Sequence, residues 1–288
     1  MKIAVLGANG QLGRKINDLS ALYTQYSFVF ADIDELDITK QAEVEQFVAA
    51  QQPDVIINCA AYTAVDKAET DYDKAKLLNA VAVGYLANAA KQHNVFFVHV
   101  STDYVFDGTN CRPYLPTDAP NPVSVYGATK LEGEKLFIAS QCRGAIVRTS
   151  WLYSEYGNNF VKTMLRLGKE KPSLNVVCDQ IGTPTYAGDL ADAILQITMN
   201  NHQIKQQEIF HFSNNGVASW YDFAHTVMEM AALPCLVMPI RSSEYPTPAQ
   251  RPFYSVFDKV KIAQMFQIAI PYWKDSLKVC IEKLQKLS

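Results

Sequence analysis

The sequence predicts an α/β protein built on a doubly wound parallel sheet, followed by a smaller C-terminal α/β domain. Short runs of β-branched and aromatic residues recur along the chain, and stretches with helical character separate the early ones. The first run leads directly into a glycine-rich turn, GANGQLG. Strand, helix and strand in repetition imply right-handed crossovers between parallel strands.

The predicted strands are apolar on almost every residue rather than on alternate residues. Strands that helices bury on both faces have this pattern. The runs are KIAVLG (2–7), SFVFADI (27–33), DVIINCA (54–60), VFFVHVS (95–101), AIVRTSW (145–151), NVVCD (175–179) and EIFHFS (208–213). Residues 40–52 and 73–93 read as helices between the early strands. This order is typical of the Rossmann arrangement.

The sequence pattern changes after Trp151, where helical patterns alternate with loops that contain proline and glycine. We therefore expect residues 1–150 to form an NAD(P)-binding Rossmann domain. Residues 151–288 are expected to form mainly a substrate-binding domain, with segments from about 180–212 returning to the first domain. The chain has no internal repeat and no low-complexity tract.

Composition indicates an ordinary globular protein of 288 residues, with 49% hydrophobic and 19% charged residues. The formal net charge of −3 gives no reason to expect a nucleic acid or an anionic membrane as partner. No apolar run approaches the roughly 20 residues that span a bilayer, and the apolar start is too short for a signal peptide. These features predict a cytoplasmic protein.

The cysteines and histidines do not predict a metal site. Six cysteines lie far apart with no C-x-x-C pair, and the five histidines form no H-E-x-x-H motif. We expect reduced thiols, several of them buried. A G-x-S-x-G elbow is also missing, so zinc and serine hydrolase chemistry are both disfavoured.

The glycine-rich turn predicts a dinucleotide site. Its glycines are Gly7, Gly10 and Gly13, a spacing one residue wider than the common G-x-G-x-x-G. Glycine permits the positive φ of a tight turn and lets backbone N–H groups approach a pyrophosphate at a helix N-terminus. Glycine triplets alone often only make turns. Here the preceding strand and the following helix favour the dinucleotide.

An acidic residue, Asp32, ends the second predicted strand, nineteen positions after Gly13. A carboxylate there accepts hydrogen bonds from the adenosine ribose, and its charge repels a 2′-phosphate. Asp32 thus favours NADH, whereas Arg14, just past the third glycine, would offset that repulsion. The sequence leaves NADPH and NADH both open, and a solvated strand-end acid is the alternative interpretation of Asp32.

Two further segments carry candidate catalytic residues. Tyr126 and Lys130 lie four residues apart in VSVYGATKLEGEKL (123–136), so on a helix they share one face. Thr102 lies in VSTDYVFDG (100–108), at the end of the fourth predicted strand. Ligands of open parallel sheets bind at the carboxyl ends of strands, so these segments are expected to meet there. Either segment alone is more often a helix face or a turn.

At these residues the chain resembles the extended short-chain dehydrogenase/reductases that act on nucleotide sugars, with their T…Y-x-x-x-K active site. The likeness is closest to the dTDP-4-dehydrorhamnose reductase branch and runs nearly end to end. The blocks that carry it are GANGQLG, NCAAYTAVDKAE (58–69), VSTDYVFDG, NPVSVYGATKLEGE (121–134), RTSWLY (148–153), DQIGTPTYAGDLA (179–191) and HFSNNGVASWYDFA (211–224).

The resemblance implies the remaining site residues. It places Gly10, Gln11 and Leu12 at the cofactor phosphates, Asp37 and Ile38 at the adenine, Ala61, Tyr62 and Thr63 along the dinucleotide groove, and Val100 and Lys130 beside Tyr126 at its nicotinamide end. It places Thr102, Asp103, Trp151 and Arg251 at the sugar nucleotide. Two departures from the family pattern are Tyr254 in place of an asparagine and Pro116 in place of an acid.

The implied reaction is the NAD(P)H-dependent reduction of the 4-keto group of dTDP-4-dehydro-L-rhamnose to dTDP-L-rhamnose, the last step in making this sugar nucleotide for cell-surface polysaccharide. Tyr126 is expected to be the general acid, a role typically worth about 10²–10⁴ in rate. A free tyrosine has a pKa of about 10, and a nearby cation lowers it. We therefore expect Lys130 to lower the pKa of Tyr126, and Thr102 to orient the same substrate oxygen.

Several alternatives stay open. A reductase or epimerase for another dTDP-sugar shares these motifs, and relatives of the fold also include non-catalytic regulatory subunits that keep a dinucleotide pocket. Dehydratases of the family place a glutamate after the Thr-Asp pair, where this chain has Tyr104, so dehydration is disfavoured. The resemblance allows a monomer or a homodimer. Some members pair through a Mg²⁺-bridged acidic surface, but the sequence has no compelling acidic cluster.

Overall fold

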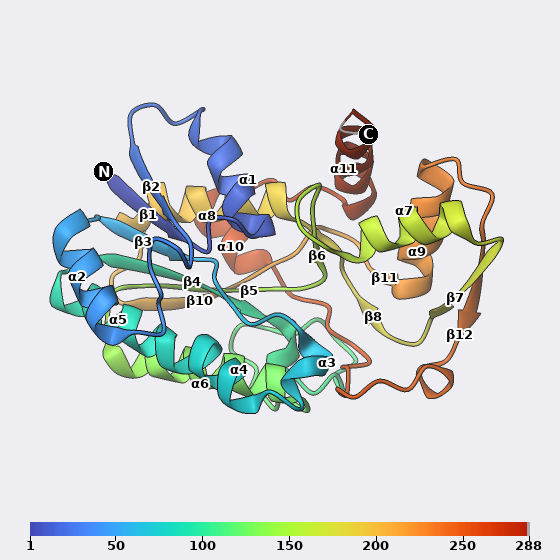
Figure 1. Cartoon of the computed structure of the whole chain (residues 1–288), viewed down its shortest axis with the longest axis horizontal. Coiled ribbons are helices and arrows are strands. Elements are labelled where there is room, and N and C mark those ends of the chain that lie inside the picture. The colour runs from blue at the N-terminus through green and yellow to red at the C-terminus, as the bar shows by residue number, and fades with distance from the viewer. Residues whose placement is uncertain (287–288) are drawn as a thin grey trace.

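The computed structural model describes residues 1–286 and has a central sheet of six parallel strands (Figure 1). The strands lie in the order β2-β1-β3-β4-β5-β10. Their bounds are β1 Lys2–Leu6, β2 Ser27–Ala31, β3 Val55–Asn58, β4 Phe96–Thr102, β5 Gly144–Thr149 and β10 Gln207–Phe212. This sheet, with helices on both faces, confirms the predicted doubly wound α/β fold.

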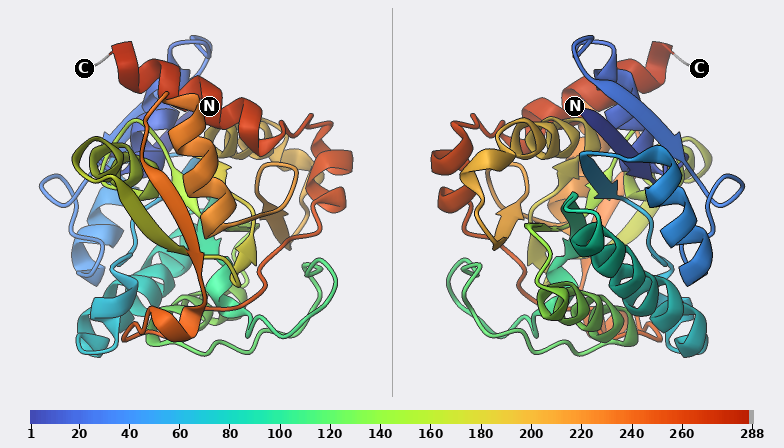
Figure 2. Two further views of the ribbon diagram at one scale, coloured as in Figure 1. Left: turned by 90° about the vertical axis from the view of Figure 1, so that its right-hand side faces the viewer. Right: turned by 90° about the vertical axis from the view of Figure 1, so that its left-hand side faces the viewer.

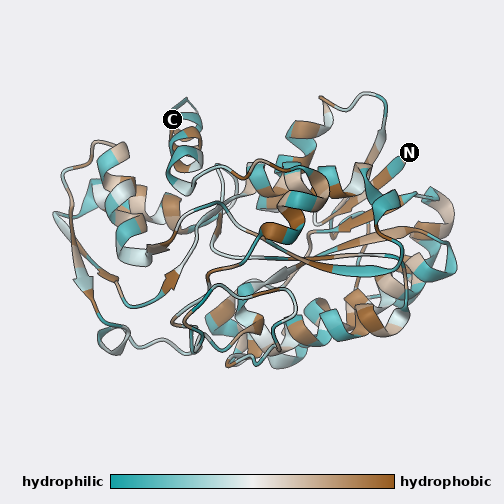
Figure 3. Cartoon of the chain, turned by 180° about the vertical axis from the view of Figure 1, so that it is seen from behind, coloured by the Kyte–Doolittle hydropathy of each residue, from teal (hydrophilic) through white to brown (hydrophobic). Residues whose placement is uncertain are grey.

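Helices cover both faces of this sheet, which explains why its strands are apolar throughout. In β1 the side chains of Ile3 and Val5 join one buried cluster, and those of Ala4 and Leu6 join another. Successive strand residues point to opposite faces, so each face needs its own apolar set. Along the flanking helices apolar and polar residues are mixed, as amphipathic packing requires (Figure 3).

The first cluster is covered by α1 Gln11–Ser20, α8 Ala187–Met199 and α10 Val260–Phe266. The second is covered by α2 Gln41–Gln51, α5 Ala82–Gln92 and α6 Val125–Ser140. The short elements between β3 and α5 are α3 Val65–Ala68, α4 Tyr72–Lys76 and one π-helical turn, η1 Leu77–Val81. A 3₁₀ turn, η2 Asp103–Val105, follows β4 directly.

A third buried cluster surrounds Phe223 and Trp273. Most of its elements lie at the end of the molecule opposite α2 (Figures 1 and 2). Its elements are α7 Phe160–Glu170, α9 Trp220–Met230, α11 Trp273–Lys286 and the short strands β6 Leu152–Tyr153, β7 Ser173–Val177, β8 Ile181–Gly182, β9 Thr185–Tyr186, β11 Ala218–Ser219 and β12 Leu236–Ile240. Two more 3₁₀ turns are η3 Asn201–Gln203 and η4 Ser242–Glu244.

Two segments from the second half of the chain belong to the main sheet region. β10 pairs with β5 along its whole length, and α8 packs on the same face as α1. We propose that the chain divides into a dinucleotide domain, made of residues 1–150 with α8 and β10, and a smaller domain made mainly of the other elements after residue 151. Within residues 1–286, no helix is long and apolar enough to cross a membrane.

The strand order reverses at β1, because the chain goes from β1 to β2 on one side and returns to β3 on the other. In doubly wound sheets the carboxyl edge beside such a reversal is where ligands bind. The segments that follow β1, β3, β4 and β5 therefore meet at one edge of the sheet.

Candidate active site

A pocket of about 770 Å³ lies at this edge. Its volume is within the usual range for small-molecule sites, about 300–1,000 Å³. Most of the residues expected from the sequence line it: Gly7, Gly10, Gln11, Leu12, Asp32, Ile38, Ala61, Thr63, Val100, Thr102, Asp103, Tyr126, Lys130 and Trp151. Gly13, Asp37, Tyr62 and Arg251 do not line it.

The glycine-rich turn brings the start of α1 against the end of β3. Gly7 has a φ of +73°, and a Cβ there would lie 2.6 Å from the backbone nitrogen of Ala60. Gly13 faces the turn, where a Cβ would collide with the carbonyl oxygen of Gly7. Gly13 therefore allows the start of α1 to pack closely against this turn. No side chain caps the N-terminus of α1, so its first N–H groups are open to an anion.

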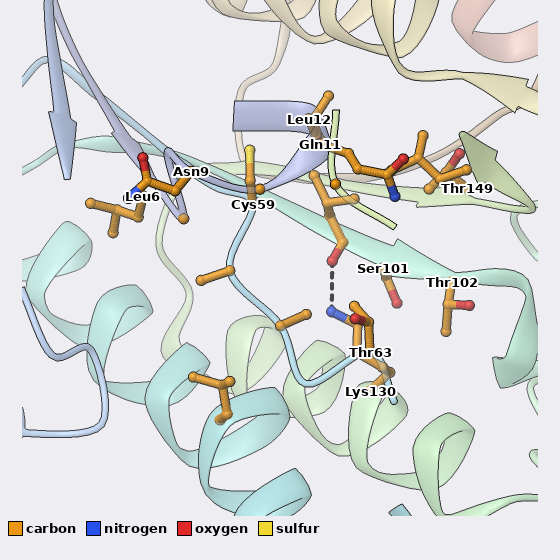
Figure 4. A pocket seen from close by; sticks show the side chains of 18 of the residues that line it. Leu6, Asn9, Gln11, Leu12, Cys59, Thr63, Ser101, Thr102, Lys130 and Thr149 are labelled. Carbon is orange, nitrogen blue, oxygen red and sulfur yellow. Dashed lines mark hydrogen bonds between the residues drawn. The ribbon is translucent and has the colours of Figure 1, made fainter. Parts of the chain in front are cut away.

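Gln11 is held from the other side of the pocket. Its side-chain oxygen accepts hydrogen bonds from Ser154 Oγ at 3.2 Å and from Asn159 Nδ2 at 2.9 Å. These bonds fix the amide so that its nitrogen, which lies in the close-up of Figure 4, is the group left for a ligand. The loop that leads into α7 is thereby tied to the dinucleotide turn.

Asp32 lies at the end of β2 and braces the same turn. One carboxylate oxygen accepts from the backbone N–H of Asn9 at 2.8 Å, and the other from that of Ile33 at 2.9 Å. Asp32 is half-buried and lines the pocket. Among the described lining residues the only lysine or arginine is Lys130. Arg14 does not line this pocket, and its guanidinium lies over the ring of Tyr156.

Two of the residues that the resemblance implies are turned away from the groove. The carboxylate of Asp37 accepts from the hydroxyl and backbone N–H of Thr39. The hydroxyl of Tyr62 donates to Asp71, and its backbone N–H donates to Asn79. Their neighbours Ile38, Ala61 and Thr63 do line the pocket, so the segments are placed as expected while these two side chains point elsewhere.

Helix α6 carries Tyr126 and Lys130 into the pocket. Ser124 caps its N-terminus by accepting from the backbone N–H of Gly127 at 3.2 Å. The helix packs against η2, which follows Thr102, so Tyr126 and Tyr104 meet edge to face with ring centroids 5.4 Å apart. The cap and this packing fix where the helix begins, and hence where the two side chains point.

Burial raises the pKa of Tyr126 to about 12; the Thr102 hydroxyl opposes this shift and the Asp103 carboxylate adds to it. The expectation that Lys130 lowers this pKa is wrong for this structure. The amine of Lys130 is turned to the carbonyl oxygen of Val100, at 2.7 Å, a bond drawn as the dashed line in Figure 4. Lys130 is itself buried, and burial lowers its pKa to about 8.

Polar atoms without partners gather near the ends of β4 and β5. Among the described residues, Ser101 Oγ, Asp103 Oδ2 and Thr149 Oγ1 are buried in the pocket wall without a hydrogen-bond partner. Burial raises the pKa of Asp103 to about 6. Buried polar groups are ordinarily paired, so this patch indicates a surface that hydroxyls or carbonyls of a ligand complete.

Trp151 walls the pocket with a stacked indole pair. Its ring lies parallel to that of Trp220, with centroids 3.7 Å apart and planes at 10°. Trp151 has a φ of +47°, an uncommon value for a bulky residue, which supporting contacts must hold in place. Arg251 instead pairs with Asp66 at 2.8 Å, outside the lining.

Sequence reasoning missed several lining residues, including Asn9, Cys59, Thr149 and Asn159. The first three lie inside the blocks already singled out, so their positions in those blocks were the available signal. Asn159 had none, because it reaches the pocket through its bond to Gln11. Within residues 1–286, no group of three or more His, Cys, Asp or Glu residues is arranged to hold a metal ion.

Known proteins match this chain over nearly its whole length. The family model described as RmlD substrate binding domain matches residues 1–286. A dTDP-4-dehydrorhamnose reductase of Aggregatibacter actinomycetemcomitans is 44% identical, covering 96% of this chain and 97% of that protein. The spore coat polysaccharide biosynthesis protein SpsK of Bacillus subtilis (strain 168) is 36% identical, over 98% of this chain and 97% of that protein.

Solved structures show the same likeness. A dTDP-4-dehydrorhamnose reductase from Clostridium acetobutylicum ATCC 824 has a TM-score of 0.94 and 43% identity, over 99% of this chain and 100% of that one. Another, from Bacillus anthracis str. Ames in complex with NADP, has a TM-score of 0.93 and 38% identity, over 98% and 99% of the chains. The chain therefore belongs to the dTDP-4-dehydrorhamnose reductase family of nicotinamide-dependent oxidoreductases.

Proposed function

We propose that this chain reduces the 4-keto group of dTDP-4-dehydro-L-rhamnose to give dTDP-L-rhamnose, with NADH or NADPH as hydride donor. The observation that supports this most is that Thr102, Tyr126 and Lys130 line one pocket together with the glycine-rich turn. The names of the relatives support the substrate, and a relative named for spore coat polysaccharide biosynthesis supports the use of the product in a cell-surface polymer.

The pocket residues supply the proton transfer. When bound, the nicotinamide supplies the hydride that reaches the carbonyl carbon. Tyr126 donates its phenolic proton to the oxygen on which negative charge develops. Its raised pKa keeps the phenol protonated at neutral pH, which is the form that a general acid needs. The hydroxyl of Thr102 orients the same oxygen.

Lys130 and Trp151 position the reactants. Lys130 projects from α6 toward the end of β4, where its N–H groups reach the pocket (Figure 4). We assign it the hydroxyls of the nicotinamide ribose as partners. Trp151, stacked on Trp220, offers a flat apolar wall to the deoxysugar. Holding the two reactants in line contributes more to the rate than any single side chain does.

We propose that NADH is accepted at least as well as NADPH. Asp32 braces the turn beside the adenosine end and presents a carboxylate there. Among the described lining residues no cation balances it at that end. A 2′-phosphate would therefore meet the Asp32 carboxylate with no cation among the described lining residues beside it.

The proposed location is the cytoplasm, since all six cysteines are free thiols, the state that a reducing compartment maintains. The experiment that tests the function supplies dTDP-4-dehydro-L-rhamnose with NADH and NADPH separately. We expect oxidation of the cofactor with both, with kcat/KM for NADH equal to or above that for NADPH. Absence of turnover with both cofactors would refute the proposed function.

A further inference from the structure

Three side chains form a row directly beneath the nicotinamide end of the pocket: Asn58 at the end of β3, His99 in β4 and Lys130 on α6. Their exposed fractions are 0%, 0% and 2%. Asn58 Nδ2 lies 3.3 Å from His99 Nδ1, and His99 Nε2 lies 3.5 Å from Lys130 Nζ. Asn58 and His99 face each other because they are register partners on adjacent strands. We call this the Asn58–His99–Lys130 row.

The orientation of the Asn58 amide is fixed from the far side of the row. Its side-chain oxygen accepts a hydrogen bond from the backbone N–H of Ala60 at 3.1 Å. A flipped amide would set an NH₂ group against that N–H, two donors facing each other. The amino group of Asn58 therefore points at His99, and His99 Nδ1 has to be an acceptor.

The tautomer of His99 follows from this constraint. Burial lowers the pKa of His99 well below its ordinary value, and the nearby Lys130 cation lowers it further, so the ring is neutral. A neutral imidazole carries its proton on one nitrogen only. With Nδ1 accepting from Asn58, the proton resides on Nε2, and the N–H bond faces Lys130.

This N–H changes what Lys130 prefers. A charged ammonium has three donors and no acceptor, so it gains nothing from a facing N–H. An uncharged amine has a lone pair that accepts from His99 Nε2 while one of its own N–H groups donates to the carbonyl oxygen of Val100. The row as built therefore favours release of the third proton of Lys130.

The other groups around Lys130 do not reverse this preference. Glu134, one turn further along α6, favours the ammonium. Its carboxylate accepts hydrogen bonds from Arg148 Nη2 at 2.7 Å and from Arg148 Nε at 2.9 Å, so its charge is offset by the guanidinium. The thiol of Cys59 is neutral, because burial raises its pKa to about 12.

We propose that Asn58 and His99 are positioning residues for the reaction: Asn58 fixes His99 in the Nε2–H tautomer, and His99 thereby sets how tightly Lys130 holds its third proton. The proposal rests on the role of Lys130 in the proposed function. In the proposed function Lys130 holds the hydroxyls of the nicotinamide ribose, and its ammonium offers one N–H donor more than the uncharged amine, so the row determines where activity falls as pH rises. Burial of Lys130 lowers its pKa and so acts in the same direction as the row.

The test has a spectroscopic arm that does not depend on activity. The chain has five histidines, so ¹⁵N labelling of histidine gives a small set of ring signals, and His99→Gln assigns those of His99 by their loss. We expect Nε2 protonated and Nδ1 unprotonated in the unaltered protein throughout the neutral pH range. A protonated Nδ1 would overturn the proposal.

The second arm of the test uses a substitution that should move the His99 proton from Nε2 to Nδ1. In Asn58→Asp a carboxylate accepts from both the Ala60 N–H and the ring, so the proton moves to Nδ1 and the Nε2 lone pair faces Lys130. We expect the basic limb of kcat/KM to move up by about one pH unit. The matched control is Asn79→Asp, which adds a carboxylate at another fully buried asparagine bonded to Tyr62 and Thr129 rather than to His99.

The outcomes separate this proposal from the proposed function. An equal shift in both variants, or none in Asn58→Asp, would contradict the row, since a generic charge effect or no effect would explain the data. If the unaltered protein turns over no substrate, the proposed function fails, whereas the ring-nitrogen measurement still decides the tautomer. The same measurement decides it if Asn58→Asp does not fold.

Discussion

The hydroxyl of Thr102 donates to the carboxylate of Asp103 at 3.0 Å, while the second oxygen of that carboxylate lies buried in the pocket wall without a partner among the described residues. The proton of Thr102 is thus directed at Asp103, its neighbour in the chain. A ligand oxygen that reaches Thr102 has to compete for this proton. In the proposed function this pair couples the charge of Asp103 to binding of the substrate.

Asp103 should also make stability depend on pH. Its pKa is raised by burial to about 6 from an ordinary value near 3.8. The folded state then binds more protons than the unfolded state between these values, so stability falls as pH rises through this window. For Asp103→Asn we predict a gain in the free energy of unfolding of roughly 1–3 kcal/mol at pH 8 and little change at pH 4. Denaturant unfolding at both pH values measures this, and equal effects at the two would contradict it.

Removing the hydroxyl of Tyr126 should slow the chemical step and leave binding of the cofactor unchanged. We predict that Tyr126→Phe lowers kcat by about 10²–10⁴ while the Kd of the cofactor stays the same. Steady-state kinetics and fluorescence titration measure the two quantities. The control is Tyr153→Phe, whose buried hydroxyl has no partner among the described residues and does not line the pocket. Substantial reductase activity in Tyr126→Phe would remove the general-acid role.

The cofactor preference should depend on Asp32. We predict that Asp32→Ala raises kcat/KM for NADPH about tenfold relative to that for NADH, because the carboxylate beside the ribose is gone. The matched control is Asp34→Ala, which removes an exposed carboxylate of the same loop that does not line the pocket. An unchanged ratio in Asp32→Ala would assign the discrimination to other residues.

The buried ion pair of Glu134 and Arg148 should be required for stability. Both side chains are at most 2% exposed, and Arg148 binds the carboxylate through two nitrogens. Glu134→Gln leaves a buried guanidinium uncompensated, so we predict a loss of about 3–5 kcal/mol. The exposed pair of Arg166 and Glu170 supplies the control, where Glu170→Gln should change stability by less than about 0.5 kcal/mol. Similar losses in both variants would contradict the prediction.

Much of this site could be predicted from the sequence because its parts lie at strand ends. Apolar runs marked the six strands of the sheet, and parallel strands bring their carboxyl ends to one edge. The segments of Gly7, Thr102 and Tyr126 could therefore be placed together from the sequence alone.

Side-chain direction could not be predicted in the same way. The charges around Lys130, and the turn of its amine to Val100, depend on burial and on contacts between segments far apart in the sequence. The bond from Asn159 to Gln11 joins residues 148 positions apart, for which no local pattern exists. The run NVVCD shows the same limit, since it forms β7 and pairs with β12 outside the main sheet.

The transfer of a deuterium label tests the central claim most directly. Nicotinamide cofactor carrying deuterium at its transferable position would be supplied with dTDP-4-dehydro-L-rhamnose, and the product sugar identified by NMR. We predict dTDP-L-rhamnose with deuterium at C4, formed in equal amount to the oxidised cofactor. A product that lacks the label, or that forms without consumption of the cofactor, would contradict reduction of the 4-keto group by this chain.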